Sequence, residues 1–518
     1  MCLRYFDSFG FFVLIVLIFL LTSPSYSQGK YPADAWEVWR DPVRISRFVV
    51  TNDNVFVTAE NGIWVWNRYK EHWEPPFTIV PGFSEAYDLK NIRNLQWNPD
   101  QSLVVTTEKD MFTRDGSWHY WTKRPLFDAL PPDSTKTRNI DCTHPDQQLH
   151  GDDLSSWISP QDWNAYHDGR LIYTDDITLR TTNTMIDDKN MLWSIVNGAG
   201  IIRGNGYTKK WQFERLGPSE RTLRCMAKDS TGWVVGGTHT GVSFFDEPNR
   251  TWSWSIQYGK RFQLGSRAIR DIAKNGDKYY LATDIGVIVG AASDTYWKLC
   301  DGFRSIHIYS VCNIGSNVAV GTDRGVELLS SDGGITPLYN ELKHPLVANQ
   351  IAADGDTLFC STTLGILKIN TKTGTYTFLD GPPGIASDDW ATIEFTPSEI
   401  WVGGRDGVAA LDRRSLKWYS WSSGTYFNSG WSLTIAPTDT TVWVGGTEGL
   451  FRIDRDSLGR LDNDPASKLS PRVHRYTLSD GLPALQINQV LLDGSRLVMV
   501  TEAGFCIFRY LHEGRTLE

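Results

Sequence analysis

Two nearly identical stretches decide the fold: "IWVGGRDGVAALD" (Ile400–Asp412) and "VWVGGTEGLFRID" (Val442–Asp454). Each contains an apolar triplet, a pair of glycines, two polar residues, a third glycine and a second apolar run. Apolar runs on both sides of a glycine are typical of a β-hairpin, because glycine readily adopts the positive φ of a tight turn. The stretches therefore predict a hairpin that recurs along the chain.

The pattern occurs in ten places, one of which is a degenerate copy without the turn glycine. Besides the two stretches above, the copies are Val55–Trp66, Leu103–Thr113 (the degenerate one), Leu192–Ile202, Trp233–Phe245, Tyr279–Val289, Val318–Leu329, Leu358–Ile369 and Leu497–Phe508. From Gly200 to Gly504 the turn glycines follow at intervals of 41, 45, 39, 40, 42, 42 and 55 residues. A period near forty with strand patterns on both sides of a turn is typical of β-propeller blades.

We therefore predict an all-β protein, a β-propeller of about ten four-stranded blades. The composition agrees, since 45 glycines, 23 prolines and 13% aromatic residues suit short strands joined by tight turns. Ten blades fit either one large ring or two packed rings. The tryptophans of the repeated strand are expected in the core: Trp64, Trp193, Trp233, Trp401 and Trp443.

The two ends of the repeat region complement each other. Ala35–Asp41, "AWEVWRD", has the pattern of an outer strand without a blade, whereas the last blade ends in "FCIFRY" (Phe505–Tyr510) and lacks an outer strand. Pairing the first with the last would close a ring and remove exposed strand edges. We expect the N-terminal strand to close the propeller.

The loop "DGLP" (Asp480–Pro483) and the Trp-Val-Gly-Gly motif at Trp443 carry a family resemblance. Together they resemble the two-component regulator propeller repeats of periplasmic sensor halves in hybrid two-component systems. The resemblance covers most of the chain and is strongest from Trp193 to Phe508. It implies a sensor-type propeller. In that family a membrane helix and a kinase follow the propellers; this sequence shows neither, so a separate signalling partner is expected.

The N-terminus indicates the compartment. An apolar run, Phe11–Leu21, precedes small residues at Ser25 and Ser27, the pattern of a cleaved signal peptide. We expect a periplasmic or secreted protein with no membrane span in the mature chain. The expected organisation is a signal peptide over 1–27, N-terminal blades over 28–121, an insertion with a decorating hairpin over 122–180, and the main blades over 181–518. The insertion is a further candidate for contact with a ligand or partner, because long insertions are often functional.

Several functional classes lack support in the sequence. The net charge of −9 gives no basic surface for nucleic acid. The cysteines lie mostly in apolar strand patterns, which favours buried free thiols, and no metal or cofactor motif is present. No hydrolase or nucleotide-binding motif occurs, and the carboxylate pairs Asp187–Asp188 and Asp388–Asp389 have the pattern of solvated loop acids. We therefore predict a non-enzyme.

The first strand of each blade supplies the candidate site, because these strands line the central channel of a propeller. Two polar positions recur there between apolar ones, and four strands place an arginine at such a position. Convergent arginines suit carboxylates or sulfates; pairing with acids of neighbouring blades is the structural alternative. Two tryptophans are expected at the channel mouth. The candidate residues are Arg47, Arg93, Arg224, Arg270, Tyr309, Asn349, Gln350, Trp390, Trp431, Asn488 and Gln489.

The predicted function is an exported, sensor-like binding module for an extracellular ligand such as an oligosaccharide, with anionic ligands suggested by the arginines. An alternative is a protein-protein scaffold in a cell-envelope or secretion assembly. A weaker alternative is a propeller lyase or hydrolase acting on polysaccharide.

Overall fold

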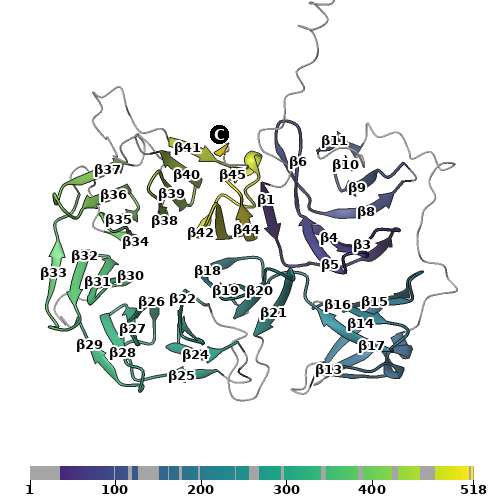
Figure 1. Ribbon diagram of the computed structural model, residues 1–518, viewed down its shortest axis with the longest axis horizontal. Coiled ribbons are helices and arrows are strands. Elements are labelled where there is room, and N and C mark those ends of the chain that lie inside the picture. Colours follow the sequence, from purple (N-terminus) through teal and green to yellow (C-terminus); the bar gives the residue numbers. More distant parts are fainter. Residues whose placement is uncertain are drawn as a thin grey trace, which may run out of the picture.

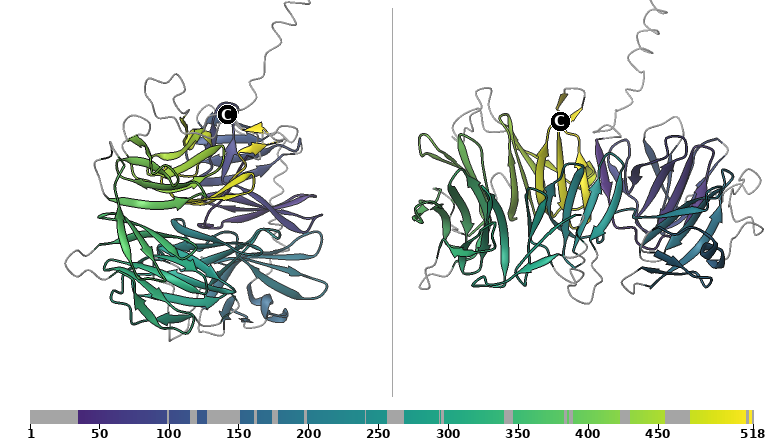
Figure 2. Two further views of the ribbon diagram at one scale, coloured as in Figure 1. Left: turned by 60° about the vertical axis from the view of Figure 1, so that its left-hand side comes forward. Right: turned by 60° about the horizontal axis from the view of Figure 1, so that its bottom comes forward.

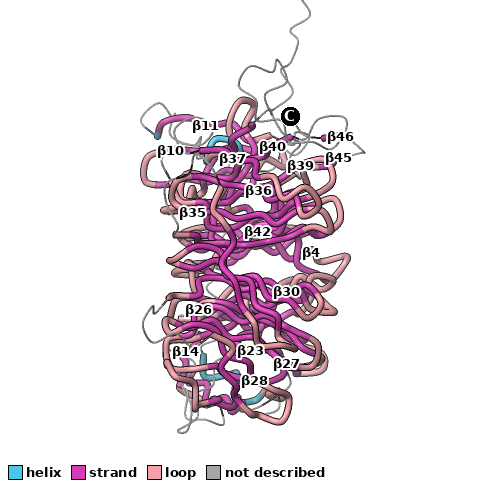
Figure 3. The backbone as a smooth tube through the Cα atoms, turned by 90° about the vertical axis from the view of Figure 1, so that its left-hand side faces the viewer, coloured by secondary structure: helices cyan, strands magenta, loops and turns pink. Residues whose placement is uncertain are grey.

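The computed structural model describes residues 35–98, 100–114, 120–126, 151–160, 163–173, 178–196, 199–239, 241–255, 268–292, 294, 297–339, 346–382, 385, 389–422, 430–454, 473–512 and 515–516. Within these ranges nearly all regular structure is strand, and the helical segments are the short 3-10 turns η3 (Gly151–Ser156) and η5 (Leu478–Asp480) (Figure 3). None of the helical segments described is long and apolar enough to cross a bilayer. The expected all-β propeller fold is confirmed.

Seven four-stranded antiparallel sheets form a closed ring, because their innermost strands contact one another in a complete cycle (Figure 1). In chain order, each from its inner to its outer strand, they are β18 (Leu223–Lys228), β19 (Gly232–Gly237), β20 (Val242–Asp246) and β21 (Thr251–Ser255); β22 (Asp271–Asn275), β23 (Lys278–Ala282), β24 (Val287–Ala291) and β25 (Lys298–Cys300); β26 (Ile308–Ile314), β27 (Asn317–Thr322), β28 (Gly325–Leu329) and β29 (Ile335–Pro337); β30 (Ala348–Asp354), β31 (Thr357–Thr362), β32 (Gly365–Asn370) and β33 (Tyr376–Leu379); β34 (Trp390–Phe395), β35 (Glu399–Gly404), β36 (Gly407–Asp412) and β37 (Trp418–Ser422); β38 (Ser432–Pro437), β39 (Thr441–Gly446), β40 (Gly449–Asp454) and β41 (Val473–Tyr476); and β42 (Ile487–Asp493), β43 (Arg496–Thr501), β44 (Gly504–Phe508) and β1 (Trp36–Trp39).

The last of these sheets combines the two ends of the chain. Strand β1 pairs antiparallel with β44, with Trp36 opposite Phe508 and Trp39 opposite Phe505. The predicted closure by the N-terminal strand is therefore confirmed. Closure gives β44 a partner on its outer side and leaves the ring without an open end.

Three further sheets lie beside the ring in an open arc, formed by the residues between β1 and β18 (Figures 1 and 2). They are β2 (Arg47–Val50), β3 (Asn54–Ala59), β4 (Gly62–Asn67) and β5 (His72–Phe77); β8 (Ile92–Trp97), β9 (Leu103–Thr107), β10 (Asp110–Arg114) and β11 (Trp121–Pro125); and a six-stranded sheet of β12 (Trp163–Ala165), β13 (Arg170–Tyr173), β14 (Thr178–Ile186), β15 (Met191–Val196), β16 (Gly200–Asn205) and β17 (Lys210–Glu214). The expectation of one large ring or two packed rings was wrong, because the sheets form one ring of seven and a separate open arc of three.

The segment between the second and third arc sheets contains the hairpin β12–β13, which turns at Gly169 with a φ of 75° and extends the third sheet. Two small sheets complete the described chain: β6 (Ile79–Pro81) with β7 (Ala86–Asp88), and β45 (Leu511–His512) with β46 (Arg515–Thr516). The expected signal peptide and residues 127–150 of the insertion lie outside the described residues.

The turn glycine of the repeat has two roles. At Gly407 φ is 137°, and a Cβ would lie 2.2 Å from the carbonyl oxygen of Trp421 in the outer strand β37. The glycine therefore allows the turn and also the close approach of the fourth strand. The same geometry occurs at Gly504, where a Cβ would lie 2.3 Å from the carbonyl oxygen of Trp39. Strand β1 thus occupies the place of a fourth strand in the closing sheet.

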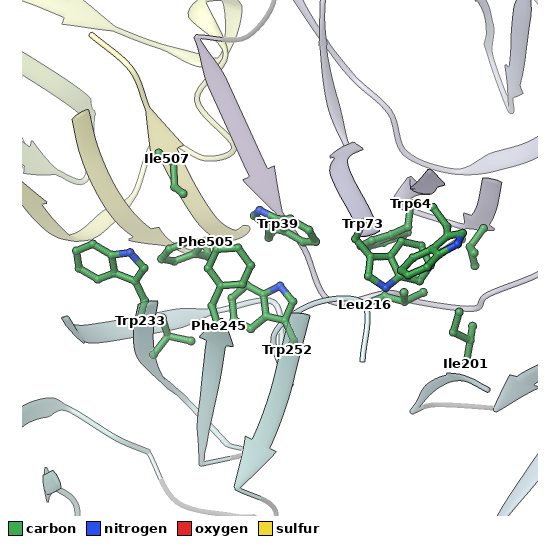
Figure 4. Close-up of a cluster of buried hydrophobic side chains, with 14 of the residues drawn as sticks. Trp39, Trp64, Trp73, Ile201, Leu216, Trp233, Phe245, Trp252, Phe505 and Ile507 are labelled. Atoms are coloured by element: carbon green, nitrogen blue, oxygen red, sulfur yellow. The ribbon is translucent and has the colours of Figure 1, made fainter. Parts of the chain in front are cut away.

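The largest hydrophobic cluster spans the ring and the arc (Figure 4). Trp39 of β1 packs against Phe245 and Trp252 of the first ring sheet, with ring centroids 5.2 and 6.2 Å apart. On the arc side, Trp73 donates its indole N–H to Glu214 Oε2 at 2.8 Å and joins the first and third sheets. The five tryptophans of the repeated strand are each at most 1% exposed, so their predicted place in the core is confirmed.

Candidate functional site

Four of the predicted site residues of the ring occupy one structural position, a β-bulge near the start of the inner strand. The pairing register shifts across Arg224 in β18, Tyr309 in β26, Asn349 in β30 and Asn488 in β42. Arg270 stands directly before β22, where its N–H bonds to the carbonyl of Ala282 at 2.9 Å. A bulge leaves its extra residue outside the ladder and turns its side chain away from the sheet. We call this level of the ring the bulge level.

The four arginines do not converge. Arg47 and Arg93 belong to the arc, whereas Arg224 and Arg270 belong to the ring. Arg47 donates to Asn94 Oδ1 at 2.9 Å, and Arg93 pairs with Glu108. The prediction of one arginine-lined channel was therefore wrong for Arg47 and Arg93. Their strands resemble the inner strands of the ring in sequence but belong to sheets of the arc.

The predicted amide ligands bind neighbouring blades instead. Asn349 Nδ2 donates to the carbonyl of Trp390 at 2.7 Å, and Asn488 Nδ2 donates to the carbonyl of Leu223 at 2.6 Å. Gln350 Oε1 and Gln489 Oε1 accept the backbone N–H groups of Ile393 and Met226 at 3.0 and 2.6 Å. The prediction that these amides contact a ligand is thus corrected. They link neighbouring inner strands by bonding to backbone groups that would otherwise lack a partner.

Asp271 and Thr434 form equivalent links between blades. They accept the backbone N–H groups of Val311 and Val490 at 2.9 and 3.1 Å. Sequence reasoning missed this role. Its signal is a polar residue at the same position of the inner strand, present in six of the seven inner strands as Asp271, Ser310, Gln350, Thr392, Thr434 and Gln489.

Of the two tryptophans expected at the channel mouth, Trp390 lies elsewhere. Trp390 is 1% exposed and packs among Ile393, Ile400 and Val402, so it belongs to the core between blades. Its place at a mouth was wrong, because the apolar residues of the following strand enclose its ring. Trp431 is half-buried, and its backbone N–H and carbonyl both bond to Thr447 in the adjacent hairpin.

Three residues of adjacent inner strands remain as a candidate binding surface: Arg224, Arg270 and Tyr309. The Arg270 guanidinium carbon lies 4.5 Å from the centroid of the Tyr309 ring, and Arg270 Nη1 is buried without a hydrogen-bond partner. Arg224 is exposed, and neither arginine forms an ion pair within the described residues. A buried donor without a partner is costly, so this corner of the bulge level favours an anion.

Acidic groups lie beside this corner. Burial raises the pKa of Asp271 to about 6. Burial and the charge of Asp271 raise the pKa of Glu394 to about 7, and burial raises the pKa of the Cys312 thiol to about 12. Within the described residues no cluster of His, Cys, Asp or Glu could hold a metal ion. Burial thus favours the protonated form of Asp271 and Glu394.

In the carboxylate pair of the arc, Asp188 is exposed as expected, but the expectation of a solvated acid was wrong for Asp187. Asp187 is buried against Arg68 at 3.3 Å and accepts the indole N–H of Trp193 at 3.0 Å and the backbone N–H of Met191 at 2.9 Å. The hydrogen-bonding capacity of the Asp187 carboxylate is thus used for local structure, so this carboxylate is not free to act as a base. Asp388 of the other pair lies outside the described residues.

The cysteines within the described ranges are free: Cys225, Cys300, Cys312, Cys360 and Cys506. Cys225, Cys360 and Cys506 are buried, while Cys300 and Cys312 are half-buried. The prediction of free thiols is confirmed for these five residues, and Cys142 lies outside the described residues.

Comparison with known proteins gives similarity to solved structures. No model of a known protein family matches the chain, and no curated protein is significantly similar to it. The extracellular domain of BT4673, a proposed hybrid two-component system of B. thetaiotaomicron, matches with a TM-score of 0.45 and 15% identity, over 91% of this chain and 76% of its own. The extracellular domain of BT3049, a proposed hybrid two-component system of the same organism, gives 0.38 and 14%, over 94% and 76%.

A virginiamycin B lyase from Staphylococcus aureus matches 56% of this chain and 95% of its own, with a TM-score of 0.44 and 10% identity. All three matches are to solved structures at 10–15% sequence identity.

Proposed function

We propose that this chain is an exported, non-catalytic binding module of the sensor type, which binds an anionic extracellular ligand at the bulge level of the ring. The ligand class is an acidic oligosaccharide. The observation that carries the proposal is the corner of Arg224, Arg270 and Tyr309, in which Arg270 Nη1 is buried without a partner.

The chemistry of the corner supports this ligand class. A guanidinium presents a planar set of donors that matches a carboxylate or sulfate. Tyr309 supplies an aromatic face next to these donors, against which a sugar ring can stack. Arg224 is exposed on the neighbouring inner strand and adds a second positive charge. A ligand that combines a ring with an anionic group would use all three side chains.

The test is thermal unfolding of residues 28–518 with oligogalacturonates and, as neutral controls, malto-oligosaccharides of the same length. Binding to the folded state raises the melting temperature by linkage. We expect a rise with the acidic sugars that shrinks at about 0.5 M sodium chloride, because salt screens exposed charge pairs. The double variant Arg224→Ala/Arg270→Ala is expected to lose the rise.

The control for charge is Arg124→Ala/Arg414→Ala, which removes two exposed arginines outside the ring's inner strands and is expected to keep the rise. The exposed Arg224→Ala alone tests the site if the double variant folds poorly. An equal rise in the double variant and in its control would overturn the site. The absence of any rise across acidic sugars would favour a protein partner, the scaffold alternative.

A further inference from the structure

A separate cavity of about 480 Å³ lies where the arc meets the closing sheet of the ring. Its walls come from the first two arc sheets and from β1, with Arg509 at the ring side. The volume falls within the range of sites for small molecules. None of its residues belongs to the bulge level, so an occupant here would differ from the ligand proposed above.

The walls of this junction cavity are mainly apolar, and the aromatic rings among them contact one another. Phe77 meets Trp121 edge to face, with ring centroids 5.5 Å apart, and Trp97 stacks on Phe56 at 5.9 Å. Trp36 closes the ring side, where its other face is held by Phe508. These contacts fix the rings before any ligand enters, which lowers the entropy cost of binding.

The acids that line the cavity are already neutralised. Glu37 is 3% exposed, pairs with Arg509 at 2.8 Å and accepts the indole N–H of Trp39 at 2.8 Å. Glu74 pairs with Arg250 at 3.2 Å. Neither carboxylate therefore needs a cation from the ligand.

Arg114 is the cation of the cavity that lacks such a partner. Its guanidinium carbon lies 5.1 Å from the centroid of Phe77, and within the described residues it forms no ion pair or side-chain hydrogen bond. Burial lowers the pKa of Arg114, which marks a guanidinium partly removed from water. A half-buried cation with free donors and an aromatic neighbour provides an anion with both charge and an apolar wall.

We infer that the junction cavity is a second binding site, for a small aromatic carboxylate whose anionic group pairs with Arg114 and whose ring packs against Phe77, Trp97 and Trp121. An oligosaccharide fits less well, because apolar residues outnumber polar ones in these walls and its many hydroxyl groups would need polar partners. A bound ligand would touch the ring and the arc at once and thereby hold them together.

The test is isothermal titration calorimetry of residues 28–518 with 2-naphthoate, and with 2-naphthalenemethanol as the neutral analogue. We expect saturable binding of the carboxylate and at least about tenfold weaker binding of the alcohol. Arg114→Gln is expected to weaken 2-naphthoate to the level of the alcohol. Arg124→Gln, an exposed arginine on the neighbouring strand β11, is expected to bind like the wild type.

Equal binding of 2-naphthoate by wild type and Arg114→Gln, or no binding by wild type, would overturn the inference. If Arg114→Gln fails to fold, Arg114→Lys replaces it in the test. Lysine keeps the charge but not the planar donors, so its affinity for 2-naphthoate is expected to lie between those of the wild type and of a variant without the charge. The response to oligogalacturonates is expected to persist in Arg114→Gln. Failure at the junction cavity is therefore distinguishable from failure at the bulge level.

Discussion

Trp36 and Phe508 stack face to face, with ring centroids 3.9 Å apart and planes inclined by 9°. They come from the first and the last strand of the ring and stand opposite each other in the β1–β44 pairing. Stacked aromatic pairs add to the free energy gained by burial. This contact therefore stabilises the point at which the ring closes.

Replacing Trp36 with alanine is expected to weaken ring closure. Trp36 is half-buried, so the expected loss is about 2 kcal/mol, below the cost for a fully buried tryptophan. The measurement is the midpoint of urea unfolding. Tyr207→Ala removes an aromatic ring that is 79% exposed and is expected to change the midpoint little; similar shifts in both variants would contradict a role in closure.

The turn glycine of the repeat can be tested against a glycine that also has a positive φ but lies in open surroundings. Gly407→Ala places a Cβ against the Trp421 carbonyl, whereas Gly494→Ala, at a φ of 63°, meets nothing within 4 Å. We expect Gly494→Ala to cost about 1 kcal/mol through the positive φ alone. Gly407→Ala is expected to cost clearly more, or to abolish soluble expression. Equal melting temperatures of the two variants would show that the outer strand moves to make room for the Cβ at little cost.

The links between inner strands are expected to contribute to stability as coupled pairs. Gln350 Oε1 accepts both the Ile393 N–H and the Thr392 hydroxyl, at 3.0 and 2.6 Å. Gln350→Leu would leave these donors without a partner, at a cost of about 1–3 kcal/mol. A double-mutant cycle with Thr392→Val measures the coupling. Strict additivity of the two changes in unfolding free energy would contradict this link.

The acids inside the ring predict a pH dependence of stability. The raised pKa of Glu394, about 7, means that the folded protein keeps a proton that the unfolded chain releases above its ordinary pKa of 4.5. Folding then takes up a proton, so stability falls as the pH rises from about 4.5 to 7 and stays lowered above that range. The raised pKa of Asp271, about 6, acts in the same direction.

Glu394→Gln is expected to remove its share of this dependence. At about pH 8 the variant should melt at least about 2 °C above the wild type, and near pH 4.5 the two should agree. Differential scanning calorimetry across this range is the measurement. Glu502→Gln, which changes an exposed glutamate, controls for net charge. If the melting temperatures of Glu394→Gln and wild type change with pH in the same way, the prediction is refuted.

Much of the fold could be predicted because its signals are local. Gly407 and Gly449 each mark a tight turn that only a few residues define, and the strand pattern around Trp401 and Trp443 reports burial directly. Closure was predictable as well. The sequence has a spare outer strand near the N-terminus and a last blade without an outer strand, and the two can pair.

The site was less predictable, because it depends on which blades become neighbours. Arg93 and Arg224 occupy the same position in their strands, a bulge, yet the first lies in the arc beside Glu108 and the second in the ring. The amides of Asn349 and Gln489 look like ligand groups in the sequence, but they bond to backbone groups of the next blade. The partner in each case lies far along the chain.

By itself, the sequence determined the strand pattern, the turn positions, the core tryptophans and the closing strand, because hydrophobic periodicity and glycine conformation are properties of short segments. The tertiary structure alone decided that ten sheets divide into a ring of seven and an arc of three. It also decided that Arg224 and Arg270 lie on neighbouring strands and that Arg114 lines a cavity at the junction. These features arise from packing between blades, in which contacts join residues whose separation in sequence carries no local signal.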